Sequence, residues 1–165
     1  MTLYHGTIVE IRHPEILRSE VGRDFGFGFY TTDIQEQAER WAIRKAKIAS
    51  RKLTEPVEAV VNVYEWNTDI PMNIKKFDGT SLEWLDFVVT CRSNVSFTHE
   101  YDIVTGKIAN DNVGETVSYV VQGIMRREDA LERLKFEKIN NQIAFCTEAS
   151  LGTLAFVKSY GLEVR

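Results

Sequence analysis

Three short stretches, far apart in the chain, combine polar and aromatic residues that could bind a sugar and a flat ring. They are residues 3–7 (Leu-Tyr-His-Gly-Thr), residues 24–32 (Asp-Phe-Gly-Phe-Gly-Phe-Tyr-Thr-Thr) and a run that begins at Gln142. The imidazole of His5 could hydrogen-bond a sugar hydroxyl, and the ring of Tyr30 could stack on a planar group. The amide of Gln142 could orient a sugar through hydrogen bonds, but it cannot act as a base or hold negative charge.

Small and aromatic neighbours could complete such a site. Gly6 would let a ligand approach the backbone, whose N–H and C=O could bind an amide edge, and the Thr7 hydroxyl could add a further hydrogen bond. Gly28 leaves room beside Tyr30 on the same face of a strand. Trp41 could close the other side of an aromatic sandwich, although a core position is the more usual place for a tryptophan.

Each polar residue also has a purely structural interpretation. His5 could be a strand-end histidine with a local partner, and Gln142 could cap a neighbouring loop. Glu148, just past the third stretch, is a rival for the sugar contact, but its place at a helix N-terminus also explains it. Asp102 lies inside a predicted strand, where a salt bridge is the expected partner, and Asp111 fits a turn.

Hydrophobic periodicity predicts the elements that would position these residues. The helices and strands occur in blocks without regular alternation, which favours an α+β fold. We expect strands at residues 3–7, 25–31, 57–66, 101–106 and 142–146. We expect helices at residues 34–52, 82–93, 113–125, 128–138 and 147–160.

Local signals refine several of these elements. Thr32 or Asp33 would cap the first helix, Ser81 the second and Thr147 the last, which Gly161 would end. Residues 25, 27 and 29, all phenylalanine, would share one face of their strand and join the core.

Bulk composition predicts a single globular domain over residues 1–165. The chain is 44% hydrophobic and 27% charged, and its net charge of −4 gives no bulk attraction to nucleic acid or to a membrane. Residues after Met1 do not resemble a signal peptide, and no apolar run approaches the roughly 18 residues of a membrane span. Two cysteines without metal-type spacing predict no metal site and fit a cytoplasmic location.

The three stretches resemble the signature elements of the ADP-ribosyltransferase superfamily, in its diphtheria-toxin/poly-ADP-ribose-polymerase-like branch. From residue 3 to about residue 160 the chain resembles a bacterial family of small stand-alone domains of this type, largely known as a domain of unknown function. The resemblance implies two packed, split antiparallel sheets flanked by helices, with NAD in the cleft between them. It places His5, Tyr30 and Gln142 in the positions of the His–Tyr–Glu triad. The other NAD-binding residues that we expect are Gly6, Thr7, Gly28 and Trp41.

The resemblance implies that the chain cleaves the bond between nicotinamide and ribose in NAD, a reaction that places positive charge on the ribose. Glutamine in place of glutamate puts elongation to poly-ADP-ribose in doubt, which leaves mono-ADP-ribosylation of a protein or nucleic acid, or inactivity. Members of the superfamily often act as toxins, beside an antitoxin protein or in phage defence. The alternatives are a non-catalytic module that binds NAD or ADP-ribose, and an RNA 2′-phosphotransferase, which shares the fold but needs a basic phosphate pocket.

The predicted helix 34–52 is basic toward its C-terminal end. This pattern suits the helix dipole and a solvated face, which is the interpretation that the sequence favours. The same cations could also attract nucleic acid or the phosphates of NAD. The basic residues are Arg40, Arg44, Lys45, Lys47, Arg51 and Lys52.

Overall fold

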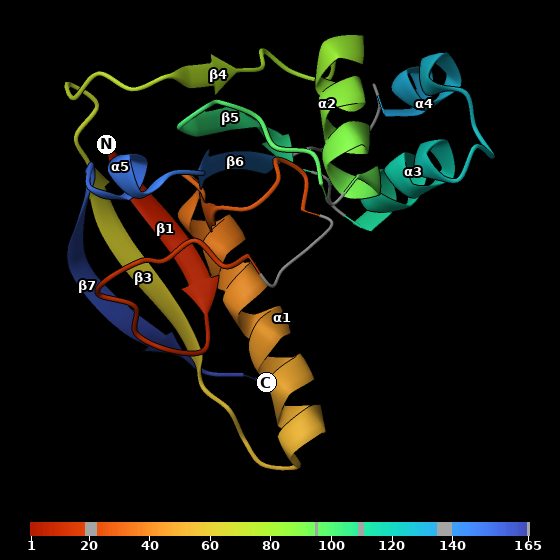
Figure 1. The fold of residues 1–165 in the computed structure, drawn as a ribbon. Helices are drawn as coiled ribbons and strands as arrows, with labels where there is room; N and C mark the ends of the chain where they lie inside the picture. The colour runs from red at the N-terminus through yellow and green to blue at the C-terminus, as the bar shows by residue number, and fades with distance from the viewer. Residues whose placement is uncertain (19–22, 95, 109–110, 135–139, 165) are drawn as a thin grey trace.

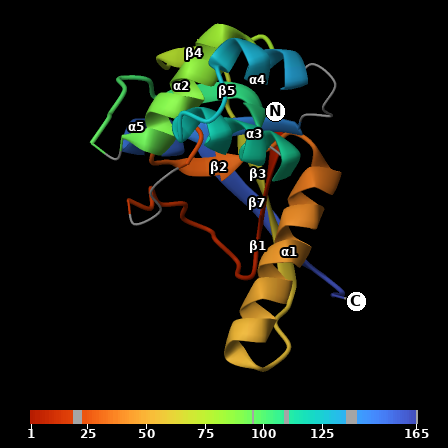
Figure 2. The same ribbon diagram turned by 90° about the vertical axis from the view of Figure 1, so that its right-hand side faces the viewer.

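The chain folds into two β-sheets that face each other, with helices on both outer sides (Figure 1). The computed structural model describes residues 1–18, 23–94, 96–108, 111–134 and 140–164. Seen from the side, helix α1 lies on one sheet and helices α2, α3 and α4 lie on the other (Figure 2). The predicted α+β class is confirmed.

The first sheet is antiparallel and has the strand order β1-β3-β7. Its strands are β1 (Thr2–Thr7), β3 (Ala59–Trp66) and β7 (Leu154–Leu162). Helix α1 (Gln35–Leu53) packs on its outer face through a row of alanines. Because the side chains at this contact are small on both the helix and the sheet, α1 approaches the sheet closely, and its backbone lies against Gly6 of β1.

The second sheet has the strand order β2-β6-β5-β4. Its strands are β2 (Phe29–Thr31), β6 (Asn140–Phe145), β5 (Ile103–Ile108) and β4 (Ile74–Lys76). Strand β4 pairs in parallel with β5, so the expectation of a fully antiparallel sheet is wrong at this edge. The reason is the connection, because a helix runs between these two strands and returns the chain to the same end of the sheet.

Three helices cover the outer face of the second sheet: α2 (Leu82–Ser93), α3 (Asp111–Val121) and α4 (Arg127–Leu134). The predicted cap of α2 is confirmed, since the Ser81 hydroxyl accepts a hydrogen bond from the Trp84 N–H at 3.1 Å. The predicted end of α4 near residue 138 lies outside the described residues.

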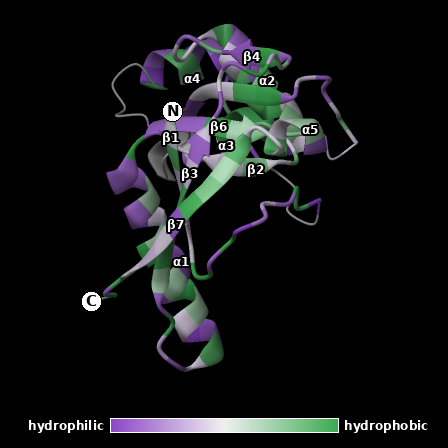
Figure 3. Cartoon of the chain, turned by 90° about the vertical axis from the view of Figure 1, so that its left-hand side faces the viewer, coloured by the Kyte–Doolittle hydropathy of each residue, from purple (hydrophilic) through white to green (hydrophobic). Residues whose placement is uncertain are grey.

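The core lies mainly between the sheets and beneath these helices. Figure 3 shows hydrophobic residues along the central strands, while much of α4 and the outward turns of α1 are hydrophilic. Alternation along β2 sends the Phe29 ring toward the first sheet and the Tyr30 ring toward the helices. Tyr30 therefore lies on the outer face of the second sheet, which the helices cover.

The predicted strand 25–31 is wrong in its first half. Gly26 has a φ of +82°, and its N–H bonds to the Arg23 carbonyl, so the chain turns there and β2 begins only at Phe29. Phe25 consequently packs in the core beneath the helices and Phe29 in the core between the sheets, while Phe27 is only half-buried. The three phenylalanines do not share a face.

The predicted final helix is also wrong beyond its first turn. Thr147 does cap a helix, α5 (Glu148–Leu151), through a reciprocal pair of hydrogen bonds with Ser150. The chain then enters β7, whose pairing with β3 supplies the backbone hydrogen bonds that a longer helix would have made internally. Gly161 is not a helix cap but a strand residue facing the Glu58 side chain.

Candidate active site

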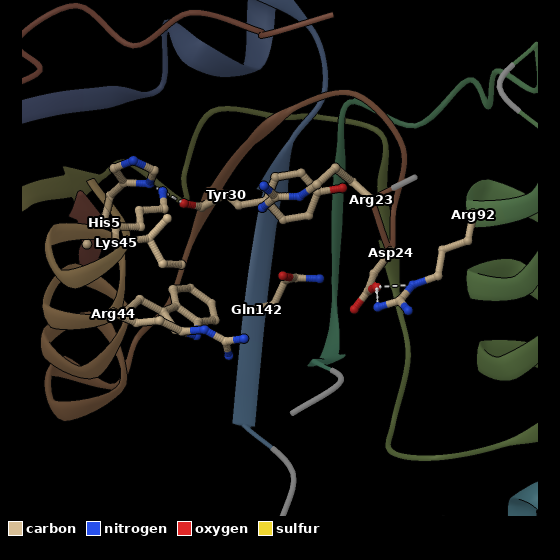
Figure 4. Close-up of a pocket in the computed structure, with 11 residues that line it drawn as sticks. His5, Arg23, Asp24, Tyr30, Arg44, Lys45, Arg92 and Gln142 are labelled. Carbon is tan, nitrogen blue, oxygen red and sulfur yellow. Dashed lines mark hydrogen bonds and ion pairs between the residues drawn. The ribbon is translucent and has the colours of Figure 1, made fainter. Parts of the chain in front are cut away.

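A cavity of about 300 Å³ lies between α1 and α2, over the ends of β1, β2 and β6 (Figure 4). It brings together five of the seven residues predicted from the sequence: His5, Gly6, Tyr30, Trp41 and Gln142. The other two, Thr7 and Gly28, line an adjoining cavity of about 330 Å³. The two cavities share His5, Arg23, Tyr30 and Lys45 in their walls.

Strand pairing explains why residues so far apart in sequence meet here. Tyr4 and Thr32 exchange two backbone hydrogen bonds, of 2.8 and 3.0 Å, which join the middle of β1 to the residue that follows β2. Strand β2 pairs with β6, where Tyr30 lies opposite Ala144. Gln142 lies two residues from Ala144 in β6, so the side chains of Gln142 and Ala144 lie on the same face of the sheet. The register of two sheets thus places His5, Tyr30 and Gln142 around one space.

His5 is held in one orientation and one tautomer. Its Nδ1 lies 2.6 Å from the Tyr30 carbonyl oxygen, and its ring stacks on Phe29 with 4.4 Å between centroids. Because a carbonyl can only accept, Nδ1 carries the proton and Nε2 is an acceptor. Burial lowers the pKa of His5 to about 3, with further lowering from Lys45, so the imidazole is neutral at physiological pH.

The depressed pKa of His5 predicts a loss of stability in mild acid. Between pH 6.5 and 3 the unfolded chain protonates this imidazole and the folded chain does not, so stability falls as pH falls, by up to about 1.4 kcal/mol per pH unit. Urea unfolding at pH 6.5 and 5 should show the wild type losing up to about 2 kcal/mol more than His5→Asn. Equal losses in both proteins would show that His5 is readily protonated in the folded state.

Tyr30 anchors the loop in front of it through its hydroxyl. The hydroxyl donates to the Gly26 carbonyl at 2.5 Å and accepts from the buried Phe25 N–H at 3.1 Å. The Arg23 guanidinium lies over the ring, 4.2 Å from its centroid. Burial raises the pKa of Tyr30 far above its usual value, so the hydroxyl stays protonated. A planar ligand would therefore stack on the face that Arg23 does not cover, or would displace Arg23.

Replacing the Tyr30 hydroxyl should affect stability more than ligand binding. In Tyr30→Phe the Phe25 N–H would lose its partner, at a cost of about 1–3 kcal/mol in unfolding free energy. The ring that would stack on a ligand is kept, so NAD affinity measured by calorimetry should change little, whereas Tyr30→Ala should lose it. Equal NAD affinity in the wild type and Tyr30→Ala would contradict the stacking role.

Gln142 is the most unusual residue of the cavity. It is only 2% exposed, and among the described residues its Nε2 has no hydrogen-bond partner. Buried polar groups almost always find a partner, because an unsatisfied one costs about 1–3 kcal/mol. Figure 4 shows the Gln142 side chain below Tyr30, between Arg44 of α1 and Asp24, and Gln142 is one of the residues that line the cavity. An acceptor atom of a ligand would satisfy this Nε2.

Charged residues surround the cavity, and sequence reasoning did not assign them to it. Arg44 and Lys45 come from α1, and Arg23 comes from the loop before β2. On the opposite side the Arg92 guanidinium from α2 pairs with the buried carboxylate of Asp24, at 2.7 Å from Nε to Oδ1. Only the basic character of residues 34–52 signalled any of them. A wall rich in guanidinium and ammonium groups is chemically suited to phosphate.

Other candidates lie away from this cavity. Glu148 is exposed at the start of α5 and is not among the described residues that line either cavity. Asp102 has no salt bridge within the described part of the chain. Its carboxylate instead accepts hydrogen bonds from the Thr147 hydroxyl at 2.8 Å and the Asn73 N–H at 2.9 Å. Asp111 begins α3.

Metal-ligating side chains and thiols are the remaining groups that could carry chemistry. Over the described ranges, no three His, Cys, Asp or Glu side chains gather where they could hold a metal ion. Cys91 and Cys146 are free thiols, and burial raises the pKa of each to about 12, so neither is a ready nucleophile.

Of the helices in the described residues, none is both long and apolar enough to span a membrane.

Comparison with known proteins adds one finding. No curated protein and no solved structure matches the chain. A family described as "Protein of unknown function (DUF3990)" matches residues 1–156. The chain therefore belongs to the DUF3990 family.

Proposed function

We propose that this chain is a mono-ADP-ribosyltransferase that uses NAD and transfers ADP-ribose to a protein or nucleic acid. The observation that carries the proposal is the meeting of His5, Tyr30 and Gln142 at one cavity, with a buried amide nitrogen that has no partner among the described residues. The resemblance of the sequence stretches to the ADP-ribosyltransferase superfamily points to the same three residues, and it does not depend on the geometry.

The size and division of the cavities fit a dinucleotide. Volumes of about 300 and 330 Å³ are each within the range of small-ligand sites, and the two spaces adjoin. NAD consists of two nucleotide halves joined by a diphosphate. The shared wall contains Arg23 and Lys45, which could hold the diphosphate while each half occupies one cavity.

Each residue has a role that follows from its atoms. The Nε2 lone pair of His5 would accept from a ribose hydroxyl, and the Gln142 Nε2 would donate to a ribose oxygen, so together they would fix the sugar. The Tyr30 ring would support the nicotinamide. The bond between ribose C1′ and nicotinamide breaks, the electron pair leaves with nicotinamide, and the acceptor nucleophile forms the new bond and releases its proton to water. Gln142 cannot take that proton, which suits a single transfer to a reactive acceptor.

The cations around the cavity favour one alternative more than the sequence did. An RNA 2′-phosphotransferase needs a basic phosphate pocket, and the sequence shows no paired arginines near its motifs. The fold nevertheless brings Arg23, Arg44 and Arg92 to the cavity from three separate segments. The reaction product therefore has to be identified directly.

The decisive experiment combines the protein with NAD and measures free nicotinamide by chromatography. We expect release of nicotinamide, and ADP-ribose on lysate macromolecules by mass spectrometry. His5→Ala should lose both while keeping its fold, and Glu148→Ala, a change outside the cavity, should keep both. Calorimetric NAD binding without nicotinamide release would instead indicate a binding module. NAD-dependent loss of phosphate from a 2′-phosphorylated oligoribonucleotide would indicate the phosphotransferase.

A further inference from the structure

A row of four cations runs along the exposed side of α1. Residues three or four apart in a helix lie on one face, with about 5–6 Å between their Cβ atoms. Arg40, Arg44, Lys47 and Arg51 follow this spacing, and all four are exposed. Together with Ile43 and Ile48 they line a shallow groove of about 540 Å³, which we call the α1 groove.

The α1 groove leads directly to the candidate active site. Arg44 and Ile48 line both the groove and the cavity that contains His5 and Gln142. In Figure 1 the C-terminal half of α1 extends beyond the second sheet and its helices, so a long ligand would have access to it. A molecule lying in the groove would have one end beside the ribose-binding residues.

The charge of this groove is opposite to that of the whole chain. The chain carries a net charge of −4, yet the stretch from Arg40 to Leu53 has six cations and no acid. The helix dipole accounts for cations in the last turn, such as Arg51, but not for Arg40 and Arg44 near the middle. A basic surface on an acidic protein indicates a local polyanionic partner.

The regular spacing favours a nucleic acid over an acidic protein. A row of evenly spaced cations matches the repeating phosphates of a nucleic-acid backbone. The exposed Ile48 lies between the cations, and the half-buried Trp41 lies in the adjoining cavity wall, where a base could pack against it. A base within a duplex could not reach this cavity, so the strand must be single or locally unpaired.

We propose that the α1 groove binds single-stranded nucleic acid and presents it as the acceptor of ADP-ribose. This inference rests on the proposed function for the transfer step but not for the binding step. A nucleophilic nitrogen or oxygen of the strand would bond to ribose C1′ as nicotinamide leaves, and the strand would release its proton to solvent. Arg40, Lys47 and Arg51 bind the backbone outside the cavity, while Arg44 stands at its entrance.

The binding step is tested without NAD, by fluorescence anisotropy of short single-stranded RNA and DNA at several salt concentrations. The variant combines R40Q, K47Q and R51Q, none of which lines the cavity. We expect it to bind about tenfold or more weakly at about 50 mM salt, with a slope of log K against log salt reduced by about 2, because each lost phosphate contact removes about 0.7. The control, which we call the α4 control, combines R126Q, just before α4, with R127Q and R133Q on α4; it changes the net charge equally and should keep the wild-type slope.

The transfer step is tested by adding NAD and following ADP-ribose on the same oligonucleotides. The wild type and the α4 control should label RNA, DNA or both, and the groove variant should label neither while still releasing nicotinamide from NAD. Equal binding by the groove variant and the α4 control would overturn the proposal, as would labelling of lysate proteins alone. Groove-dependent binding without any release of nicotinamide would leave the nucleic-acid site standing and overturn the proposed enzyme activity.

Discussion

Gln142→Ala should release nicotinamide from NAD about a hundredfold more slowly than the wild type, with little change in NAD affinity. A preorganised polar contact to a transition state contributes about 2–4 kcal/mol, and its removal lowers kcat more than it weakens ground-state binding. Initial rates over a range of NAD concentrations, together with calorimetry, separate the two effects. Gln142→Glu loses the Nε2 donor, but its carboxylate can accept a hydrogen bond from a ribose hydroxyl and stabilise the positive ribose, so the rate should be retained or raised.

A second buried glutamine provides a matched control for stability. Gln37 is fully buried, and its amide is satisfied by Asn141, donating to the carbonyl at 2.7 Å and accepting from the N–H at 3.1 Å. Gln37→Leu would orphan both backbone groups and should cost about 2–4 kcal/mol of unfolding free energy. Gln142→Leu removes an amide whose Nε2 has no partner among the described residues, so it should cost little or raise stability. Equal destabilisation by both changes would mean that the Gln142 amide has a structural role.

Elements defined by short-range signals could be predicted from the sequence. Helix α2 starts where Ser81 predicts it, and strand β1 follows the apolar run that ends at Thr7. Strand β7 could not be recognised in this way, because its stability comes from pairing with β3, almost a hundred residues earlier in the chain. Its start after a genuine helix cap at Thr147 made a continued helix the natural prediction.

The candidate site shows the same division between local and distant information. His5, Tyr30 and Gln142 stand in recognisable stretches, and the fold places them together. Arg23 and Arg92 are single basic residues with no surrounding pattern, so nothing in the sequence distinguished them from solvated surface charges. A site residue can therefore be predicted from the sequence only when it stands in a recognisable motif. An isolated arginine does not, because exposed arginines are common in any sequence.

The role of Gly6 is where the structure adds most to the sequence interpretation. Gly6 lines the cavity, as expected, but a Cβ built at this position points toward α1. That Cβ would lie 2.0 Å from the Ala38 carbonyl oxygen and 2.8 Å from the Ala42 nitrogen. Both contacts are with helix backbone, which cannot move aside as a flexible side chain could. Glycine is therefore required here for α1 to pack on β1, whether or not a ligand also uses the space.

Gly6→Ala should consequently destabilise the fold by about 3 kcal/mol or more, as overpacking against a rigid backbone does. Urea unfolding and the yield of soluble protein would measure the effect. Gly114→Ala is the matched control, since its Cβ would meet only the Arg92 guanidinium at 4.0 Å and alanine favours the α3 helix by up to about 1 kcal/mol. If Gly6→Ala instead kept wild-type stability and lost only NAD binding, the glycine would serve the ligand alone. That result would contradict the claim that α1 packs too closely on β1 to leave room for a Cβ at residue 6.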